Sequence, residues 1–212
     1  MAKESSLIPS HGGYQKLITY KLGNLIYDAT TAFCNQYIDI KDRTHDQMVQ
    51  AARSGVANII EGSVASATSR KIELKLTGIA RASQEELVAD YLAFLRQRSL
   101  PIWDPESGEA KTVRAAKPEN LSQLRQLMAF LVSDMSDKSD MSDKSDKSDK
   151  KLLKQEVAAN TMICLIRQET FLLDRQISRL CAIFEKEGGF TERLYRIRSQ
   201  NRTQKMDNSK PE

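Results

Sequence analysis

The chain is 212 residues long, with 40% hydrophobic and 28% charged residues and a formal net charge of +4. This length and balance fit one well-packed domain with appendages, and an aromatic content of only 6% favours helices over a β-sandwich or barrel. A charge of +4 is too small to indicate a nucleic-acid partner by itself, so the positions of the basic residues must carry that argument.

Several protein classes are excluded by what the sequence lacks. Its three cysteines, Cys34, Cys164 and Cys181, are scattered and form no C-x-x-C pair, which argues against a disulfide framework or a zinc site and fits a reducing compartment. No apolar run approaches the roughly 18 residues of a spanning helix. We therefore expect a cytoplasmic protein with no membrane contact, no metal and no cofactor.

The first two helices are predicted from apolar spacing and from their end signals. Residues 1–13 read as a frayed lead-in. Apolar side chains at three- and four-residue spacing predict a long helix over 14–39. Thr44 and Gln47 have the form of a capping box that begins a second helix, and Gly62 is expected to close it.

The second helix has two distinct faces. One is an apolar arc, and opposite it polar side chains recur at i, i+4 and i+7 between residues with almost no side chain. Such a face permits close approach of a second backbone, although a solvated face of small residues is the alternative. The predicted second contact surface consists of Ala51, Ser54, Gly55, Asn58 and Glu61.

The middle of the chain predicts one long and one short helix. The long one runs over 68–98 and is stopped by Pro101. We expect 100–118 to be irregular, with Trp103 closing an open end of the helix bundle. A shorter helix is predicted over 119–132 from its leucine spacing.

Residues 133–150 are six consecutive Ser-Asp-x triplets with no apolar face. Because Ser and Asp compete with helical hydrogen bonds, we predict a disordered linker inside the bundle. Capture of a metal by the aspartates is disfavoured, since an unstructured series has no fixed coordination geometry.

A last long helix is predicted over 151–187, ended by Gly188. Its apolar residues alternate spacings of three and four, which forms a coiled-coil-like seam. Phe171, Cys164 and Cys181 flank this seam and are predicted to widen the core-facing side of the helix, with the two cysteines as small core residues.

The segment 188–212 is a basic suffix. Between Phe190 and Lys205 five basic residues face one acid, and guanidinium groups beside a tyrosine suit phosphate contacts and base stacking. A basic tail that only keeps the protein in solution is the alternative. The predicted nucleic-acid-binding residues are Arg193, Tyr195, Arg196, Arg198 and Arg202 of the suffix with Lys71, Lys75 and Arg81 of the third helix.

The sequence does not indicate an enzyme. Its two histidines are His11 in the lead-in and His45 at a helix start, and no phosphate-binding glycine loop, nucleophile elbow or H-E-x-x-H helix occurs. Glu61 could in principle be a buried catalytic acid, but a structural role as a hydrogen-bonding side chain is the better interpretation. No catalytic residue is predicted.

Two motifs carry a resemblance to a known family. AARS at 51–54 with NIIEG at 58–62, followed by IARASQEEL at 79–87, resembles the A-A-x-S-x-x-x-N-I-x-E-G helix and S-x-x-E-L turn of a bacterial four-helix-bundle family. That family is named for proteins encoded in 23S ribosomal-RNA intervening sequences. The C-terminal LLDRQISRL and KEGGFTERLYRIR look like the suffix of a subgroup of these proteins.

The resemblance implies an antiparallel four-helix bundle. Related accessory proteins of diversity-generating retroelements form pentamers and associate with nucleic acid and a reverse transcriptase, so it also implies those partners. Intervening-sequence members themselves have no established activity. This chain departs from the pattern at Gly55-Val56, where members often have an Ile-Pro-like pair, and in its Ser-Asp insertion and suffix.

We therefore predict an all-α, antiparallel up-down four-helix bundle over 14–187, with one short extra helix. The predicted function is that of a non-enzymatic, self-associating accessory protein that binds RNA or DNA through its basic surface and suffix. The alternative is an oligomeric protein-interaction scaffold without nucleic acid.

Overall fold

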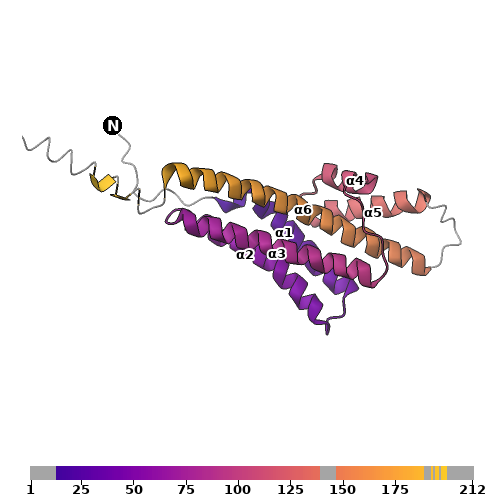
Figure 1. The fold of residues 1–212 in the computed structure, drawn as a ribbon. Helices are drawn as coiled ribbons and strands as arrows, with labels where there is room; N and C mark the ends of the chain where they lie inside the picture. The colour runs from indigo at the N-terminus through magenta and orange to yellow at the C-terminus, as the bar shows by residue number, and fades with distance from the viewer. Residues whose placement is uncertain (1–12, 139–146, 189–191, 193, 196, 200–212) are drawn as a thin grey trace, which may run out of the picture.

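The recurring apolar positions along the chain fold into a succession of helices, seen in a computed structural model that describes residues 13–138, 147–188, 192, 194–195 and 197–199 (Figure 1). The described part contains no strand, which confirms the all-α prediction. Its elements are the 3-10 turn η1 (Tyr14–Lys16) and the helices α1 (Ile18–Tyr37), α2 (Arg43–Ala65), α3 (Arg70–Gln97), α4 (Gly108–Ala116), α5 (Leu121–Lys138) and α6 (Lys147–Glu187).

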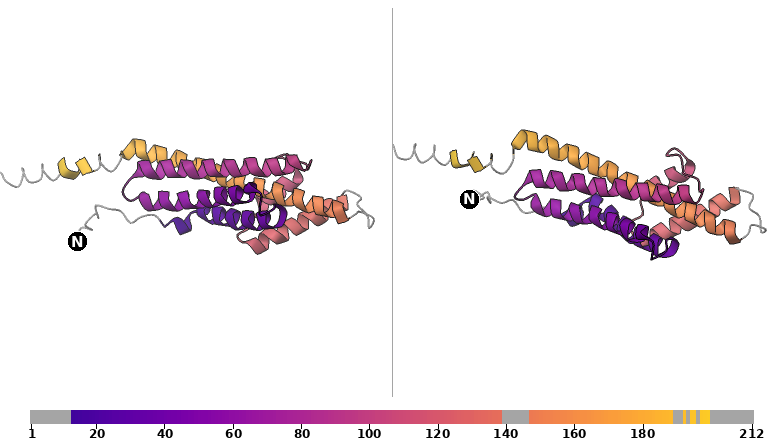
Figure 2. Two further views of the ribbon diagram at one scale, coloured as in Figure 1. Left: turned by 90° about the horizontal axis from the view of Figure 1, so that it is seen from below. Right: turned by 60° about the horizontal axis from the view of Figure 1, so that its bottom comes forward.

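The four long helices α1, α2, α3 and α6 lie side by side, and each packs mainly on two neighbours in the cyclic order α1, α2, α3, α6 (Figure 2). Helix α2 therefore lies diagonally across from α6. The shorter α4 and α5 pack on the N-terminal half of α6. The core between the long helices is apolar, and its largest fully buried side chains include Ile26, Met48, Leu87, Tyr91, Met162 and Ile166.

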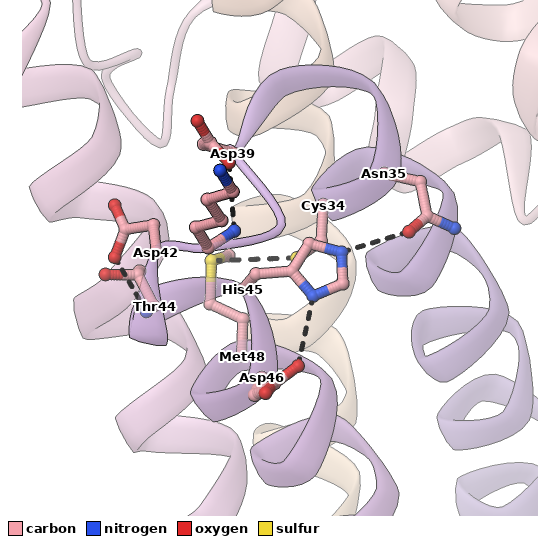
Figure 3. Close-up of polar contacts among 9 residues, drawn as sticks. Cys34, Asn35, Asp39, Asp42, Thr44, His45, Asp46 and Met48 are labelled. Atoms are coloured by element: carbon pink, nitrogen blue, oxygen red, sulfur yellow. Dashed lines mark hydrogen bonds and ion pairs between the residues drawn. The ribbon is translucent and has the colours of Figure 1, made fainter.

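The turn between α1 and α2 is fixed by carboxylates (Figure 3). Asp39 Oδ1 accepts a hydrogen bond from the Lys41 backbone N–H, and Asp42 Oδ1 accepts one from that of Thr44, both at 2.9 Å. Asp42 is thus the N-cap of α2, and the predicted Thr44–Gln47 capping box is wrong. An aspartate two residues earlier meets the same need for an acceptor at the helix start.

Side chains behind this turn tie α1 to α2 (Figure 3). His45 Nε2 lies 3.0 Å from Asn35 Oδ1, and its Nδ1 lies 3.3 Å from the Asp46 carboxylate. Beside them the buried Cys34 Sγ contacts Met48 Sδ at 4.0 Å. Because the Asn35–His45 and Cys34–Met48 contacts join the end of α1 to the start of α2, they set the relative register of the two helices.

The sequence predicts that α2 ends at Gly62, but the helix continues to Ala65. Gly62 lies against α3 instead, since a Cβ there would lie 3.4 Å from both the Glu73 carbonyl oxygen and Leu76 Cβ, at the edge of ordinary van der Waals contact. Gly62 therefore marks a place where α2 and α3 pack closely.

The segment predicted to be irregular contains the short helix α4. Ser107 caps it by accepting a hydrogen bond from the Ala110 backbone N–H. Only Ala110 and Val113 are buried, so the apolar pattern is too short to reveal a helix in the sequence. Trp103, just before α4, is held on α6 by a hydrogen bond from its indole N–H to Glu156 Oε1 at 3.1 Å.

Both ends of the Ser-Asp-x tract are helical, so the tract is not a linker over its whole predicted length. Residues 133–138 continue α5 and residues 147–150 begin α6, so the expectation of disorder is wrong for both ends. Extending an existing helix costs less free energy than nucleating a new one. The helical conformation of the packed parts of α5 and α6 therefore extends into the tract. Residues 139–146 lie outside the described residues.

The face of α2 that carries small residues packs against another helix of the same chain. Ser54 Oγ lies 3.0 Å from Ser83 Oγ of α3. Gly55 sits directly against the fully buried Gln84, so that a Cβ at Gly55 would overlap the Gln84 amide and lie 3.1 Å from its Cδ. The predicted close approach of a second backbone is therefore made by α3 of the same chain.

Replacing Gly55 with Ala is expected to destabilise the protein by about 1–3 kcal/mol, since Gln84 is enclosed and cannot move aside. Chemical denaturation followed by circular dichroism measures the change. Gly78→Ala on α3 is the matched control, because nothing lies within 4 Å of a Cβ there, and it should stabilise by about 1 kcal/mol through helix propensity. The double variant Gly55→Ala/Gln84→Ala should recover stability, and equal losses in the single and double variants would contradict the packing argument.

Candidate nucleic-acid interface

The predicted binding residues of the third helix are not equivalent in the structure. Lys71 and Lys75 are exposed on α3. Arg81 is held between two carboxylates, with its Nε 2.5 Å from Asp174 of α6 and its Nη2 3.8 Å from Glu85. The charge of Arg81 is therefore largely taken up by the contact between α3 and α6.

The suffix residues are only partly described. Tyr195 is 74% exposed and Arg198 is also exposed. Arg193, Arg196 and Arg202 lie outside the described residues. The proposed phosphate contacts of the suffix stay a prediction.

The residues of the predicted second contact surface differ in how far the fold buries them. Ala51 and Gly55 are buried, Ser54 is half-buried, and Asn58 donates a hydrogen bond to the Ser54 carbonyl oxygen at 2.8 Å. Glu61 is exposed, so it is not the buried acid considered from the sequence. Self-association through this surface stays a prediction, although most of its small residues already contact α3.

A basic stripe runs along the outer face of α6. Arg167, Phe171, Arg175 and Arg179 follow one another at four-residue spacing, and all four are exposed. Phe171 is 61% exposed, so the prediction that it widens the core seam is wrong. The four-residue spacing was visible in the sequence, but an apolar residue within a long apolar pattern gave no sign that its face would stay uncovered.

A groove of about 890 Å³ lies beside this stripe, and we call it the basic groove. Its walls come from the start of α1, from the connection between α4 and α5, and from α6. Its charged lining consists of Lys21 of α1, Arg114 and Lys117 at the end of α4, and Glu119 just before α5, and the rest of its lining is mostly apolar. A smaller hollow of about 200 Å³ adjoins it, shares Arg114 and Phe171, and adds Arg167.

The cations around the groove differ in how they are held. Arg114 donates a hydrogen bond to the Pro105 carbonyl oxygen and lies 3.6 Å from the Glu106 carboxylate. Lys21, Lys117 and Arg167 have no ion-pair partner within the described ranges. Lys21 and Lys117 thus line the larger hollow and Arg167 lines the smaller one beside it, so three cations from three separate elements border two adjoining hollows.

Lys117 occupies an unusual backbone conformation. It caps α4 with φ of 44°, in the left-handed region that favours glycine. Pro118 follows and disfavours a right-handed helical conformation at the preceding residue. The fold therefore holds a lysine side chain at the mouth of the groove at a position where glycine would be less strained.

A buried carboxyl group lies elsewhere, between the long helices. Glu169 of α6 is fully buried, and neither carboxyl oxygen has a hydrogen-bond partner among the described residues. It packs against Gly23 of α1, where a Cβ would lie 2.6 Å from Glu169 Oε1. Burial raises the pKa of Glu169 well above its ordinary value, because the charged carboxylate is disfavoured away from water.

In the described part of the chain, no set of three metal-ligating side chains comes together. Burial raises the pKa of the Cys34 thiol to about 12, which removes its nucleophilic form.

Comparisons with known proteins returned no match to a family model, to a curated protein or to a solved structure. Among the described helices, none is long and apolar enough to cross a lipid bilayer.

The buried Glu169 predicts a pH-dependent stability. The unfolded chain releases the proton near the ordinary pKa of 4.5 and the folded chain retains it, so unfolding releases a proton and stability falls as pH rises above about 4.5 until the folded pKa is reached. Glu169→Gln removes this loss. In thermal melts between pH 4 and 8, the melting temperature of Glu169→Gln should rise relative to that of the wild type as pH rises. The melting temperature of the control Glu185→Gln, at an exposed position, should follow that of the wild type. Parallel curves for Glu169→Gln would contradict a neutral buried carboxyl.

Proposed function

We propose that this protein is a non-enzymatic, nucleic-acid-binding accessory protein. The observation that carries the proposal is the basic groove with its adjoining smaller hollow, where Lys21, Lys117 and Arg167 have no ion-pair partner within the described ranges and outnumber the one lining carboxylate, Glu119. Cations left unpaired beside these hollows release counterions when they meet phosphates, which favours binding of a polyanion. The exposed Arg175 and Arg179 extend the same charge along α6.

The finer architecture and the kinship are part of the same proposal. The cyclic packing order supports an antiparallel up-down four-helix bundle built from α1, α2, α3 and α6. The contacts of Gly23 with Val56 and of Gly62 with Glu73 each pair the first part of one helix with the last part of a neighbouring one, as such a bundle requires. Membership of the intervening-sequence family is proposed from the motifs at 51–62 and 79–87 alone.

Binding to labelled 30-nucleotide RNA and DNA, followed by fluorescence anisotropy at several salt concentrations, tests this function. The groove variant Lys21→Ala/Lys117→Gly/Arg167→Ala should weaken binding at least about tenfold at 100 mM salt. Its log–log salt slope should become shallower by about 2 to 3, because three phosphate contacts are lost. Glycine at 117 fits the left-handed backbone, so the variant is expected to fold.

The matched control removes the same charge from the far side of the molecule. Lys41, Arg43 and Arg53 are exposed on the α1–α2 turn and on α2, which lies diagonally across from α6. Their triple replacement by Ala should leave the slope nearly unchanged. Equal losses in the groove and control variants would mean that only net charge matters, which rejects the groove as the site.

The suffix is tested in parallel through Arg193→Ala/Arg196→Ala/Arg198→Ala. A loss in this variant that adds to the loss in the groove variant supports binding through both surfaces. Binding unchanged by these three substitutions would remove the suffix from the proposal and leave the groove.

A second candidate function, an oligomeric protein-interaction scaffold, is favoured by exposed apolar side chains on α3. Ile72 and Ile79 are 48% and 39% exposed and lie seven residues apart, on one face of the helix. Two such residues on a long helix fit packing against a second copy.

Light-scattering mass in solution tests self-association. We expect a multiple of the 23.9 kDa chain mass, and a return towards one chain mass in Ile72→Lys/Ile79→Lys. Ile40→Lys/Ile102→Lys is the control, since these residues are 75% and 52% exposed away from α3. A single chain mass for the wild type would reject self-association, with or without nucleic acid.

A further inference from the structure

We infer that the basic groove binds single-stranded nucleic acid in preference to duplex, with one base stacked on Phe171 and the flanking phosphates held by arginine and lysine. This inference rests on the proposed function and concerns the same site. Its basis is the position of Phe171, which lines both hollows and is 61% exposed.

The neighbours of Phe171 along α6 suit a strand with unstacked bases. Arg167 and Arg175 lie one turn before and one turn after the ring, about 6 Å away along the helix axis. A base stacked on the ring would place its adjacent phosphates towards these two guanidinium groups. Stacking on an aromatic side chain flanked by cations is how single strands are bound without sequence preference.

The walls of the groove separate apolar from charged contacts. Ile18, Leu22 and Leu172 give the hollow a largely apolar lining, while Lys21 and Lys117 reach it from two different elements, α1 and the connection between α4 and α5. A flat base face matches the lining, and the charged backbone matches the rims. In a duplex the base faces are covered by neighbouring pairs, so only its phosphates can use this site.

An acidic amphipathic helix of a protein partner is the competing occupant. It would also combine apolar contacts with the groove cations. However, it makes no special use of an aromatic ring, so a leucine at 171 would serve it equally well. The two occupants therefore differ in their dependence on the π-system at position 171.

The experiment compares a labelled 20-nucleotide oligo(dT) and oligo(U), which have no paired structure, with a 20-base-pair duplex at 50 and 150 mM salt. The full chain should bind the single strands at least about tenfold more tightly. Phe171→Ala should weaken single-strand binding by about 5- to 150-fold, the range that corresponds to the loss of one stacked base, and should leave duplex binding within about twofold.

Further variants isolate the ring. Phe171→Trp should retain single-strand affinity, and Phe171→Leu should lose it as Phe171→Ala does. Phe130→Ala on α5 is the matched control, since Phe130 is 59% exposed and lies outside both hollows. Melting temperatures of all four variants establish that they are folded.

Three outcomes would overturn the inference. One is equal or tighter binding of the duplex, and a second is wild-type single-strand affinity in Phe171→Ala. The third is displacement of the strand by an acidic helical peptide that binds Phe171→Leu as well as the wild type. Binding of neither strand nor duplex at 50 mM salt is a different result, because it rejects the proposed function itself.

Discussion

The structure depends on how closely the long helices approach one another at the level where polar side chains enter the core. Gly23 of α1 makes room for Glu169 of α6, and Gly55 of α2 makes room for Gln84 of α3. Both polar side chains are fully buried and lack hydrogen-bond partners among the described residues. Burying them has a free-energy cost, so this level fixes the helix register at some loss of stability.

The same constraint determines which side of α6 meets solvent. A helix turns 100° per residue, so residues two positions away from Glu169 point about 200° away from it. With Glu169 directed between the long helices, Arg167 and Phe171 must both lie on the opposite face. The inward position of one buried carboxyl group thus accounts for the outward position of the basic, aromatic stripe.

The groove also needs the segment between the third and last long helices. The loop before α4 is held on α6 through Trp103 and Asn160, whose side-chain oxygen accepts the Trp103 backbone N–H at 2.9 Å. This attachment places the end of α4, with Arg114 and Lys117, at the groove that Lys21 of α1 also lines. Cations that are far apart in the sequence come together because a short helix is anchored beside α6.

The sequence by itself determined that the chain is helical and roughly where α1, α2, α3 and α6 lie, because apolar spacing and end signals are local properties of the chain. It also indicated that the small face around Gly55 allows close helix approach. Only the tertiary structure decided that α3 occupies that face, that Phe171 is exposed, and that Arg81 pairs with Asp174. Periodicity records that a face is apolar or small, but which neighbour covers it depends on contacts between residues distant in the sequence. For the same reason the basic groove, built from three separate elements, could not be predicted from any one of them.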